Sequence, residues 1–187
     1  MNSIQKAIVP GILAGVLALA GLSRLVNPPI TVSAATEEAQ QAAPAASAPA
    51  GCQFASRYPA KTLPWCELIE QAANEYGVDA LLISAVMLQE SGGQPEVMSG
   101  SGAVGLMQVM PRDGIAASFQ CINGPCFASR PSIEELKDPA FNVDYGVRML
   151  AGLIAKYGDV REALKHYGPY DVGYLYADKV LTIRNGL

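Results

Sequence analysis

The chain has 187 residues and a net charge of -4. Residues 1–34 contain Lys6 and Arg24 but no acidic residue, so the remainder of the chain is more acidic than the whole. A nucleic-acid-binding protein needs clustered Lys and Arg to neutralise phosphates. The charge balance therefore argues against a nucleic-acid partner, although it does not exclude neutral or zwitterionic glycans.

The N-terminus has the pattern of an export segment. A short start with Lys6 precedes a long apolar run, and Val32-Ser33-Ala34 supplies small residues where a signal peptidase cleaves. We predict that residues 1–34 are a signal peptide or, alternatively, a membrane anchor. A spanning helix needs about 20 apolar residues, and residues 7–26 reach that length only by including Arg24. Both alternatives place the rest of the chain outside the cytoplasm.

A linker rich in Ala and Pro is predicted over residues 35–61. Up to Ala50 it has no bulky apolar side chain, so it cannot bury enough surface to offset the entropy of ordering. Gly51-Cys52 raises the alternative of a lipid-modified cysteine. We reject that alternative because the hydrophobic segment would have to lie directly before the cysteine. Residues 62–187 then form one domain of ordinary size.

The four cysteines, which are Cys52, Cys66, Cys121 and Cys126, fit an exported domain with disulfides. Three pairings are possible. Cys121 and Cys126 flank the turn-forming sequence Ile-Asn-Gly-Pro and can meet locally, which leaves Cys52 with Cys66. A metal site or a nucleophilic cysteine is disfavoured because His166 is the only histidine and no Cys-x-x-Cys pair exists. No cofactor is expected.

The domain is predicted to be all-α or nearly so, because no stretch alternates with period two and no repeat is visible. Capping boxes at Ser132 and Asp159 mark two helix starts. We expect helices over about 64–76, 80–91, 105–111, a short one from 132, 139–157, 160–167 and 172–183.

Glu90 is the candidate acid. On a helix that starts after Asp79, Leu82 and Val86 share a face with Glu90, which therefore continues a buried stripe. Partial burial and the negative end of the helix dipole both favour the protonated carboxyl. A carboxylic acid that keeps its proton near neutral pH can protonate a glycosidic oxygen. The alternative is a solvated glutamate beside the turn at Gly92.

The residues that follow resemble a known family. They look like the lytic transglycosylase domain of the soluble lytic transglycosylase (SLT) type, over about residues 64–181. The matching segments are Glu90-Ser91, Ser99, Ser101, Gly102 to Pro111 (GAVGLMQVMP), Asp138-Pro139 with Asn142 and Gly146, Ala163 to Pro169 (ALKHYGP) and Tyr176 to Leu181.

The resemblance implies a helical, goose-lysozyme-like fold and a peptidoglycan substrate. Glu90 matches the family's single acid and base. The residues that the resemblance places along the sugar site are Ser99, Ser101, Gln108 and Tyr167. Met107 and Tyr167 are expected to offer apolar or aromatic surface to sugars, whereas core packing is favoured for Tyr174 and Tyr176.

One departure from the family concerns the segment after Tyr167. The family has an Asn and one further residue before Gly-Pro, and both are missing here. The shorter loop is expected to change one wall of the glycan groove without affecting Glu90.

The implied reaction is lytic cleavage between MurNAc and GlcNAc, which closes a 1,6-anhydro ring without consuming water. Ordinary glycosidases use two carboxylates, but neither Glu96 nor Asp113 matches a catalytic position in the family. A muramidase that hydrolyses the same bond remains an alternative, and so does a non-catalytic glycan-binding module.

The expected partners are peptidoglycan strands, in the periplasm or cell envelope. Residues 7–26 are a candidate membrane anchor. The sequence does not choose among general wall remodelling, a secretion or conjugation apparatus and a phage.

Overall fold

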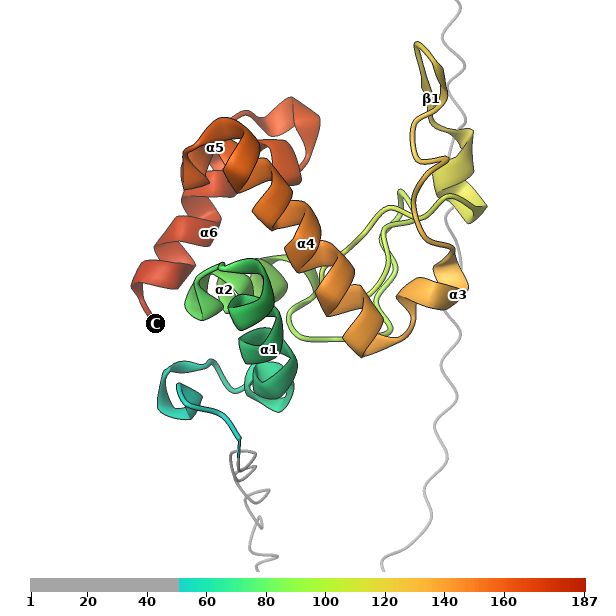
Figure 1. Cartoon of the computed structure of the whole chain (residues 1–187). Coiled ribbons are helices and arrows are strands. Elements are labelled where there is room, and N and C mark those ends of the chain that lie inside the picture. The colour runs from blue at the N-terminus through green and yellow to red at the C-terminus, as the bar shows by residue number, and fades with distance from the viewer. Residues whose placement is uncertain (1–50) are drawn as a thin grey trace, which may run out of the picture. The chain divides into compact units, whose positions relative to one another are not determined.

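The computed structural model describes residues 51–187, and this part of the chain is mostly helical (Figure 1), which confirms the predicted fold class. The predicted export segment and most of the predicted linker lie outside these residues. No helix within 51–187 is both long and apolar enough to cross a bilayer. The helices are α1 (Cys66–Tyr76), α2 (Ala80–Ser91), α3 (Ile133–Leu136), α4 (Pro139–Tyr157), α5 (Val160–Tyr167) and α6 (Leu175–Asn185).

Shorter elements connect these helices. Single 3-10 turns lie at Ala55–Arg57, Leu63–Trp65, Gly114–Ser118 and Tyr170–Val172. Two short antiparallel strands, β1 (Gln120–Cys121) and β2 (Gly124–Pro125), pair Cys121 with Gly124.

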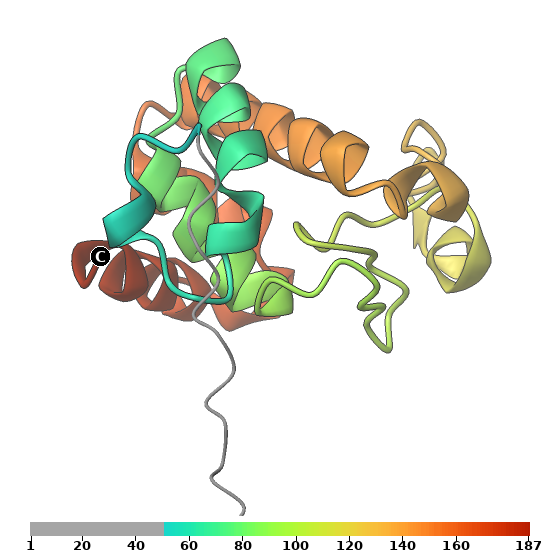
Figure 2. The ribbon, with the colours of Figure 1, turned by 90° about the horizontal axis from the view of Figure 1, so that it is seen from below.

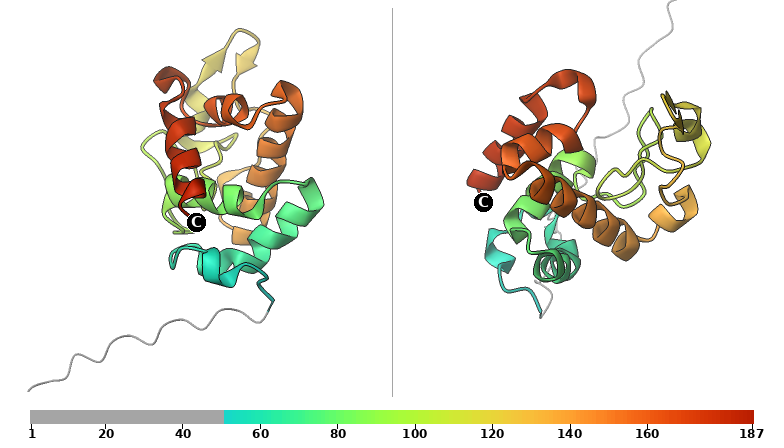
Figure 3. Two further views of the ribbon diagram at one scale, coloured as in Figure 1. Left: turned by 90° about the vertical axis from the view of Figure 1, so that its left-hand side faces the viewer. Right: turned by 45° about the horizontal axis from the view of Figure 1, so that its top comes forward.

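Five helices form a closed ring around the core. α1 packs against α2 and α4, α2 packs against α6, and α5 packs against both α4 and α6. The left panel of Figure 3 looks onto this ring. Figure 2 shows the loop 92–111 and the β1–β2 hairpin towards the α3 end of α4. The largest fully buried side chains come from the ring and from this loop, and they include Ile69, Ile83, Met87, Leu106, Met107, Leu150 and Leu164.

Helix α2 runs through the centre of the domain. The Asp79 side chain accepts a hydrogen bond from the Leu81 amide at 2.9 Å and caps the start of the helix. Gly92, with φ of 61°, ends it. All residues from Ala80 to Met87 are buried. The dense apolar sequence of α2 thus reflects burial on all sides, as predicted.

The expected helix over residues 105–111 does not form. Val104 and Val109 instead exchange two backbone hydrogen bonds, at 3.0 and 3.1 Å, around a four-residue turn. Gly105 and Gln108 in that turn have φ of 78° and 45°. Gln108 is the one non-glycine residue within 51–187 with positive φ, and such a backbone conformation is incompatible with an α-helix.

Buried Asn142 on α4 holds this turn in place. Its Oδ1 accepts a hydrogen bond from the Met107 amide at 2.8 Å. Its Nδ2 donates to the carbonyl oxygens of Val104 and Leu136, both at 2.9 Å. A Cβ on Gly105 would lie 2.3 Å from Nδ2, so only glycine allows this approach.

Both predicted disulfides are present, Cys52–Cys66 and Cys121–Cys126. Residues 51–61, which composition assigns to the linker, contact α1. Besides the first disulfide, the Glu70 carboxylate accepts hydrogen bonds from the amides of Gln53 and Phe54 and from the Tyr58 hydroxyl.

The predicted helix starts agree with the structure in most details. Ser132 and Glu135 form the predicted reciprocal capping box. Asp159 accepts from the Glu162 amide at 2.8 Å, but the Glu162 carboxylate bonds Lys165 and Tyr174 instead of closing a second box. The last helix begins at Leu175, later than predicted.

We predict that Asn142→Ala lowers the free energy of unfolding by about 3 kcal/mol, because three backbone groups each lose a buried hydrogen bond, although the Val104 carbonyl oxygen keeps its bond from the Val109 amide. Denaturant titration measures this loss. Exposed Asn74 on α1 provides the matched control, and Asn74→Ala should stay within about 0.5 kcal/mol of the wild type. Equal stability of the two variants would contradict the role given to Asn142.

Candidate active site

Glu90 lies in the last turn of α2 and is half-buried. Leu82 and Val86 on the same face are 4% and 0% exposed, so Glu90 does continue a buried stripe. Burial raises the pKa of the Glu90 carboxyl from 4.5 to about 7. A hydrogen bond from the Tyr176 hydroxyl of α6 to Glu90 Oε1 acts in the opposite direction, because it stabilises the carboxylate. Near neutral pH, both protonation states of Glu90 are therefore populated.

A cavity of about 280 Å³ opens beside this carboxyl. Three segments meet around it: the end of α2, the loop after α2 and the end of α5. The lining residues are Glu90, Ser99, Ser101, Ala103, Gln108, Met110, Tyr167, Gly168 and Pro169. The structure thus brings together five of the six predicted site residues, and Met107 is the exception.

The serine turn, residues 99–103, is ordered by its own hydrogen bonds. Ser99 Oγ accepts from the Ala103 amide at 2.9 Å and lies 3.0 Å from Ser101 Oγ. Ser101 is exposed, so its hydroxyl can also bond a ligand. The turn presents two adjacent hydroxyl groups to the cavity, which suits recognition of a polar, uncharged group.

Most of the hydrogen-bonding groups of the Gln108 side chain are used within the protein and are not free for a ligand. Its Nε2 donates to the carbonyl oxygens of Val97 and Gly105, both at 3.0 Å. These bonds commit both N–H groups and support the positive φ of Gln108. The carbonyl oxygen is left to accept a hydrogen bond from a ligand.

Met107 does not face the cavity, which corrects the expectation that it offers apolar surface to a sugar. Its side chain is fully buried, and a Cβ on Gly146 of α4 would lie 2.5 Å from Met107 Cβ. The Met107 backbone has a supporting role instead, because its carbonyl oxygen accepts a hydrogen bond from the Tyr167 hydroxyl at 3.0 Å. This bond fixes the tyrosine at the cavity wall.

Tyr176 is the functional contact that sequence reasoning missed. The preference for core packing is correct, since the side chain is 6% exposed, but its hydroxyl also bonds Glu90. A Cβ on Gly168 would lie 2.4 Å from the Tyr176 ring, so the glycine makes room for this ring. Tyr174 is 36% exposed, which corrects the expectation of core packing; it does not line the cavity and its hydroxyl donates to Glu162.

No second carboxylate joins Glu90 among the described residues that line the cavity. Asp113 Oδ1 accepts from the Ile133 amide at 2.9 Å, which is a structural contact at the start of α3. Glu96 is exposed and lines a different cavity with Lys137. Within residues 51–187, no three metal-ligating side chains come together.

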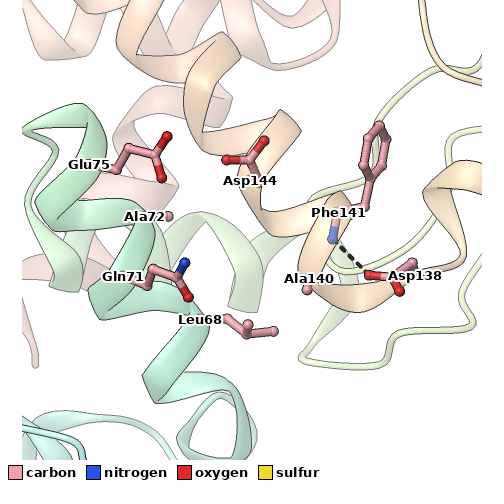
Figure 4. Close-up of a pocket in the computed structure, with 8 residues that line it drawn as sticks. All are labelled: Leu68, Gln71, Ala72, Glu75, Asp138, Ala140, Phe141 and Asp144. Atoms are coloured by element: carbon pink, nitrogen blue, oxygen red, sulfur yellow. Dashed lines mark hydrogen bonds between the residues drawn. The ribbon is translucent and has the colours of Figure 1, made fainter.

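A larger cavity, of about 400 Å³, lies between α1 and α4 (Figure 4). Two of its three acidic side chains, those of Asp138 and Asp144, have structural tasks, and the third, Glu75, is exposed. Asp138 Oδ1 caps α4 by accepting from the Phe141 amide at 2.8 Å. Asp144 accepts from the Tyr76 hydroxyl at 2.6 Å. Because Asp138 and Asp144 are engaged within the fold and Glu75 is exposed, whereas Glu90 is half-buried, we place the candidate site at the smaller cavity.

Comparisons with known proteins identify the family that this part of the chain resembles. Residues 67–174 match the family described as transglycosylase SLT domain. The chain is 38% identical over 97 residues to membrane-bound lytic murein transglycosylase E of Buchnera aphidicola subsp. Acyrthosiphon pisum, covering 52% of this chain and 42% of the relative.

Two further relatives have other sources. The endo-type membrane-bound lytic murein transglycosylase A of Klebsiella pneumoniae is 37% identical over 91 residues, covering 49% of this chain and 43% of the relative. The transglycosylase of Enterobacteria phage PRD1 is 34% identical over 105 residues, covering 56% of this chain and 34% of the relative. The matches thus span less than half the length of these curated relatives.

We predict that Tyr176→Phe raises the pKa of Glu90 further. The substitution removes the hydrogen bond that favours the carboxylate and leaves the burial that disfavours it. The carboxyl carbon of Glu90, followed by NMR during a pH titration, reports the change. Tyr174→Phe is the control and should leave this pKa in place. A lower pKa in Tyr176→Phe would contradict the assignment.

We also predict that Glu90→Gln stabilises the fold at alkaline pH. The folded-state pKa of about 7 exceeds 4.5, so the wild-type protein loses stability as pH rises through this window. Glutamine stays neutral. The free energy of unfolding of Glu90→Gln should exceed that of the wild type by about 3 kcal/mol at pH 8 and equal it at pH 4. Denaturant titrations at both pH values measure it, with exposed Glu96→Gln as the control. A gain that does not depend on pH would refute the buried charge.

Proposed function

Because the chain belongs to the family of transglycosylase SLT domains, we propose that it cleaves the MurNAc–GlcNAc β-1,4 bond of peptidoglycan. Glu90 is the single general acid and base of this reaction. The observation that carries the proposal is the half-buried Glu90 carboxyl at the cavity, with a pKa raised to about 7. The neighbouring hydroxyl groups of Ser99 and Ser101 support a sugar ligand.

In the first step Glu90 acts as an acid. Its protonated carboxyl gives the proton to the bridging oxygen, and the bond from C1 of MurNAc to that oxygen breaks. The acetamido oxygen of the same sugar bonds to C1 and takes up the developing positive charge. An acid with a pKa near the ambient pH is suited to this transfer, since it holds a proton but also releases it readily.

In the second step the Glu90 carboxylate acts as a base. It removes the proton from the 6-hydroxyl of MurNAc, and O6 bonds to C1 as the bond from the acetamido oxygen breaks. Glu90 ends protonated, as it began, and no water is consumed. The Tyr176 hydrogen bond stabilises the carboxylate between the two steps.

The absence of a second carboxylate among the described lining residues favours this route over ordinary hydrolysis. Inverting and retaining glycosidases need a partner carboxylate to activate water or to attack C1. In the proposed reaction the substrate supplies the two groups that attack C1. The acetamido oxygen takes the place of the partner carboxylate, and O6 takes the place of water. One group that changes protonation state is then sufficient.

The place of action that we propose is the cell envelope. The two disulfides fit an oxidising compartment. Two of the relatives are named as membrane-bound, and a third belongs to a phage. Glycan strands are the proposed partner, and residues 7–26 are the candidate anchor. The site itself is compatible with either a cellular or a phage setting.

We predict that Glu90→Gln lowers the rate of lysis of purified sacculi by a factor of about 10³ or more, because a glutamine cannot exchange the proton. Release of soluble fragments measures the rate. Glu96→Gln is the matched control, since this exposed residue lies outside the cavity, and it should retain full activity. Equal lysis by Glu90→Gln and the wild type would reject Glu90 as the acid.

The products distinguish a transglycosylase from a muramidase. Mass spectrometry of the released fragments should show a 1,6-anhydro end, which is lighter by one water than a reducing end. Reducing ends alone would identify a muramidase. Binding to sacculi without any cleavage by the wild type would identify a glycan-binding module.

A further inference from the structure

A disulfide-bonded arm, residues 112–131, projects from the helical body with the β1–β2 hairpin at its tip (Figure 1). Its base is closed by a hydrogen bond from the Arg112 amide to the Pro131 carbonyl oxygen at 2.9 Å. The Cys121–Cys126 disulfide closes the hairpin. Because a two-stranded hairpin is marginally stable in water by itself, these two closures keep the arm in one shape.

The first half of the arm touches the serine turn. Ala116 is fully buried. A Cβ on Gly102 would lie 3.2 Å from both the Ala116 amide nitrogen and Ile115 Cβ, so the arm rests directly against this glycine. Gly102 follows Ser101, which lines the cavity. The arm is therefore continuous with the cavity wall.

The second half of the arm contacts α4. The Arg130 side chain contacts the thioether of Met149 on α4 and lies 6.0 Å from the Phe127 ring centroid. Arg130 makes no ion pair with any carboxylate of the described residues. Its positive charge opposes the rise in the pKa of Tyr167, which is caused mainly by burial.

The surface between these two ends is uncharged and apolar. Residues 114–129 contain no Asp, Glu, Lys or Arg, although the chain as a whole is acidic. Ile115 and Phe119 are 55% and 41% exposed. Phe119 packs edge-to-face against Phe127, with centroids 6.0 Å apart, so its ring is held in a fixed orientation. A rigid exposed apolar surface beside a cavity is typical of a ligand contact.

We propose that this arm binds the glycan strand beyond the cavity, with Ile115 and Phe119 packing against the apolar face of a further sugar. This inference rests on the proposed function. A cavity of about 280 Å³ is at or below the usual lower size of a ligand pocket, about 300 Å³, whereas a glycan strand continues in both directions. The uncharged surface does not repel the carboxylates of peptide stems, and the unpaired Arg130 attracts them.

The test compares substrates of different length. Phe119→Ala and Ile115→Ser should each lower kcat/KM on long, defined glycan strands about tenfold, mainly through KM. The shortest strand that is cleaved should be processed as by the wild type. Ile122→Ser, at the far tip of the arm, is the matched control and should change neither. Replacing both cysteines, Cys121→Ser with Cys126→Ser, should reproduce the loss on long strands.

Two results would overturn the proposal. A loss that is equal for all lengths would mean that the arm only supports the serine turn, and no loss at any length would mean that strands do not touch the arm. Binding of strands to Glu90→Gln, with and without Phe119→Ala, tests the arm independently of cleavage. Failure of the wild type to lyse any substrate rejects the proposed function, whereas length-independent binding rejects the arm.

Discussion

The geometry of the site depends on one buried amide. Asn142 accepts a hydrogen bond from the backbone of the 105–108 turn and donates to both the Val104 and the Leu136 carbonyl oxygens. The turn therefore cannot become a helix, and Gln108 keeps a backbone conformation that would otherwise be costly. The same turn aims the Met107 carbonyl oxygen at Tyr167. One side chain on α4 thus positions two cavity residues that it does not itself contact.

The second requirement of the site is a balance of two opposing effects on Glu90. Burial of the Glu90 carboxyl among the helices raises its pKa, and the hydrogen bond from the Tyr176 hydroxyl limits that rise. Either effect alone would leave a carboxyl that holds its proton too tightly, or loses it too early, for the acid and base roles that we propose for Glu90. The glycine at position 168 is part of the same balance, because a side chain there would displace the Tyr176 ring.

The sequence predicts what is local. Helix periodicity, caps, the disulfide pairs and the buried face of Glu90 depend on residues within a few turns of one another, and the structure agrees with most of them; the second capping box and the start of α6 are the exceptions. The errors that change the site arise from distant contacts. The apolar segment 105–111 has a helical composition, but Asn142, more than thirty residues away, determines its shape. The Tyr176 bond to Glu90 spans 86 residues, and no periodicity in either helix signals it.

Residues 52–58, which are attached to α1, determine where tension on the chain enters the domain. The described chain enters the fold through Cys52, which is bonded to the first residue of α1. Hydrogen bonds from Gln53, Phe54 and Tyr58 to Glu70 attach the next residues to the same helix. Tension applied along the chain ahead of Cys52 is therefore borne by a covalent bond to α1. Such tension reaches α1 first, and Glu90 lies on the neighbouring helix α2 instead of on the helix that is covalently attached.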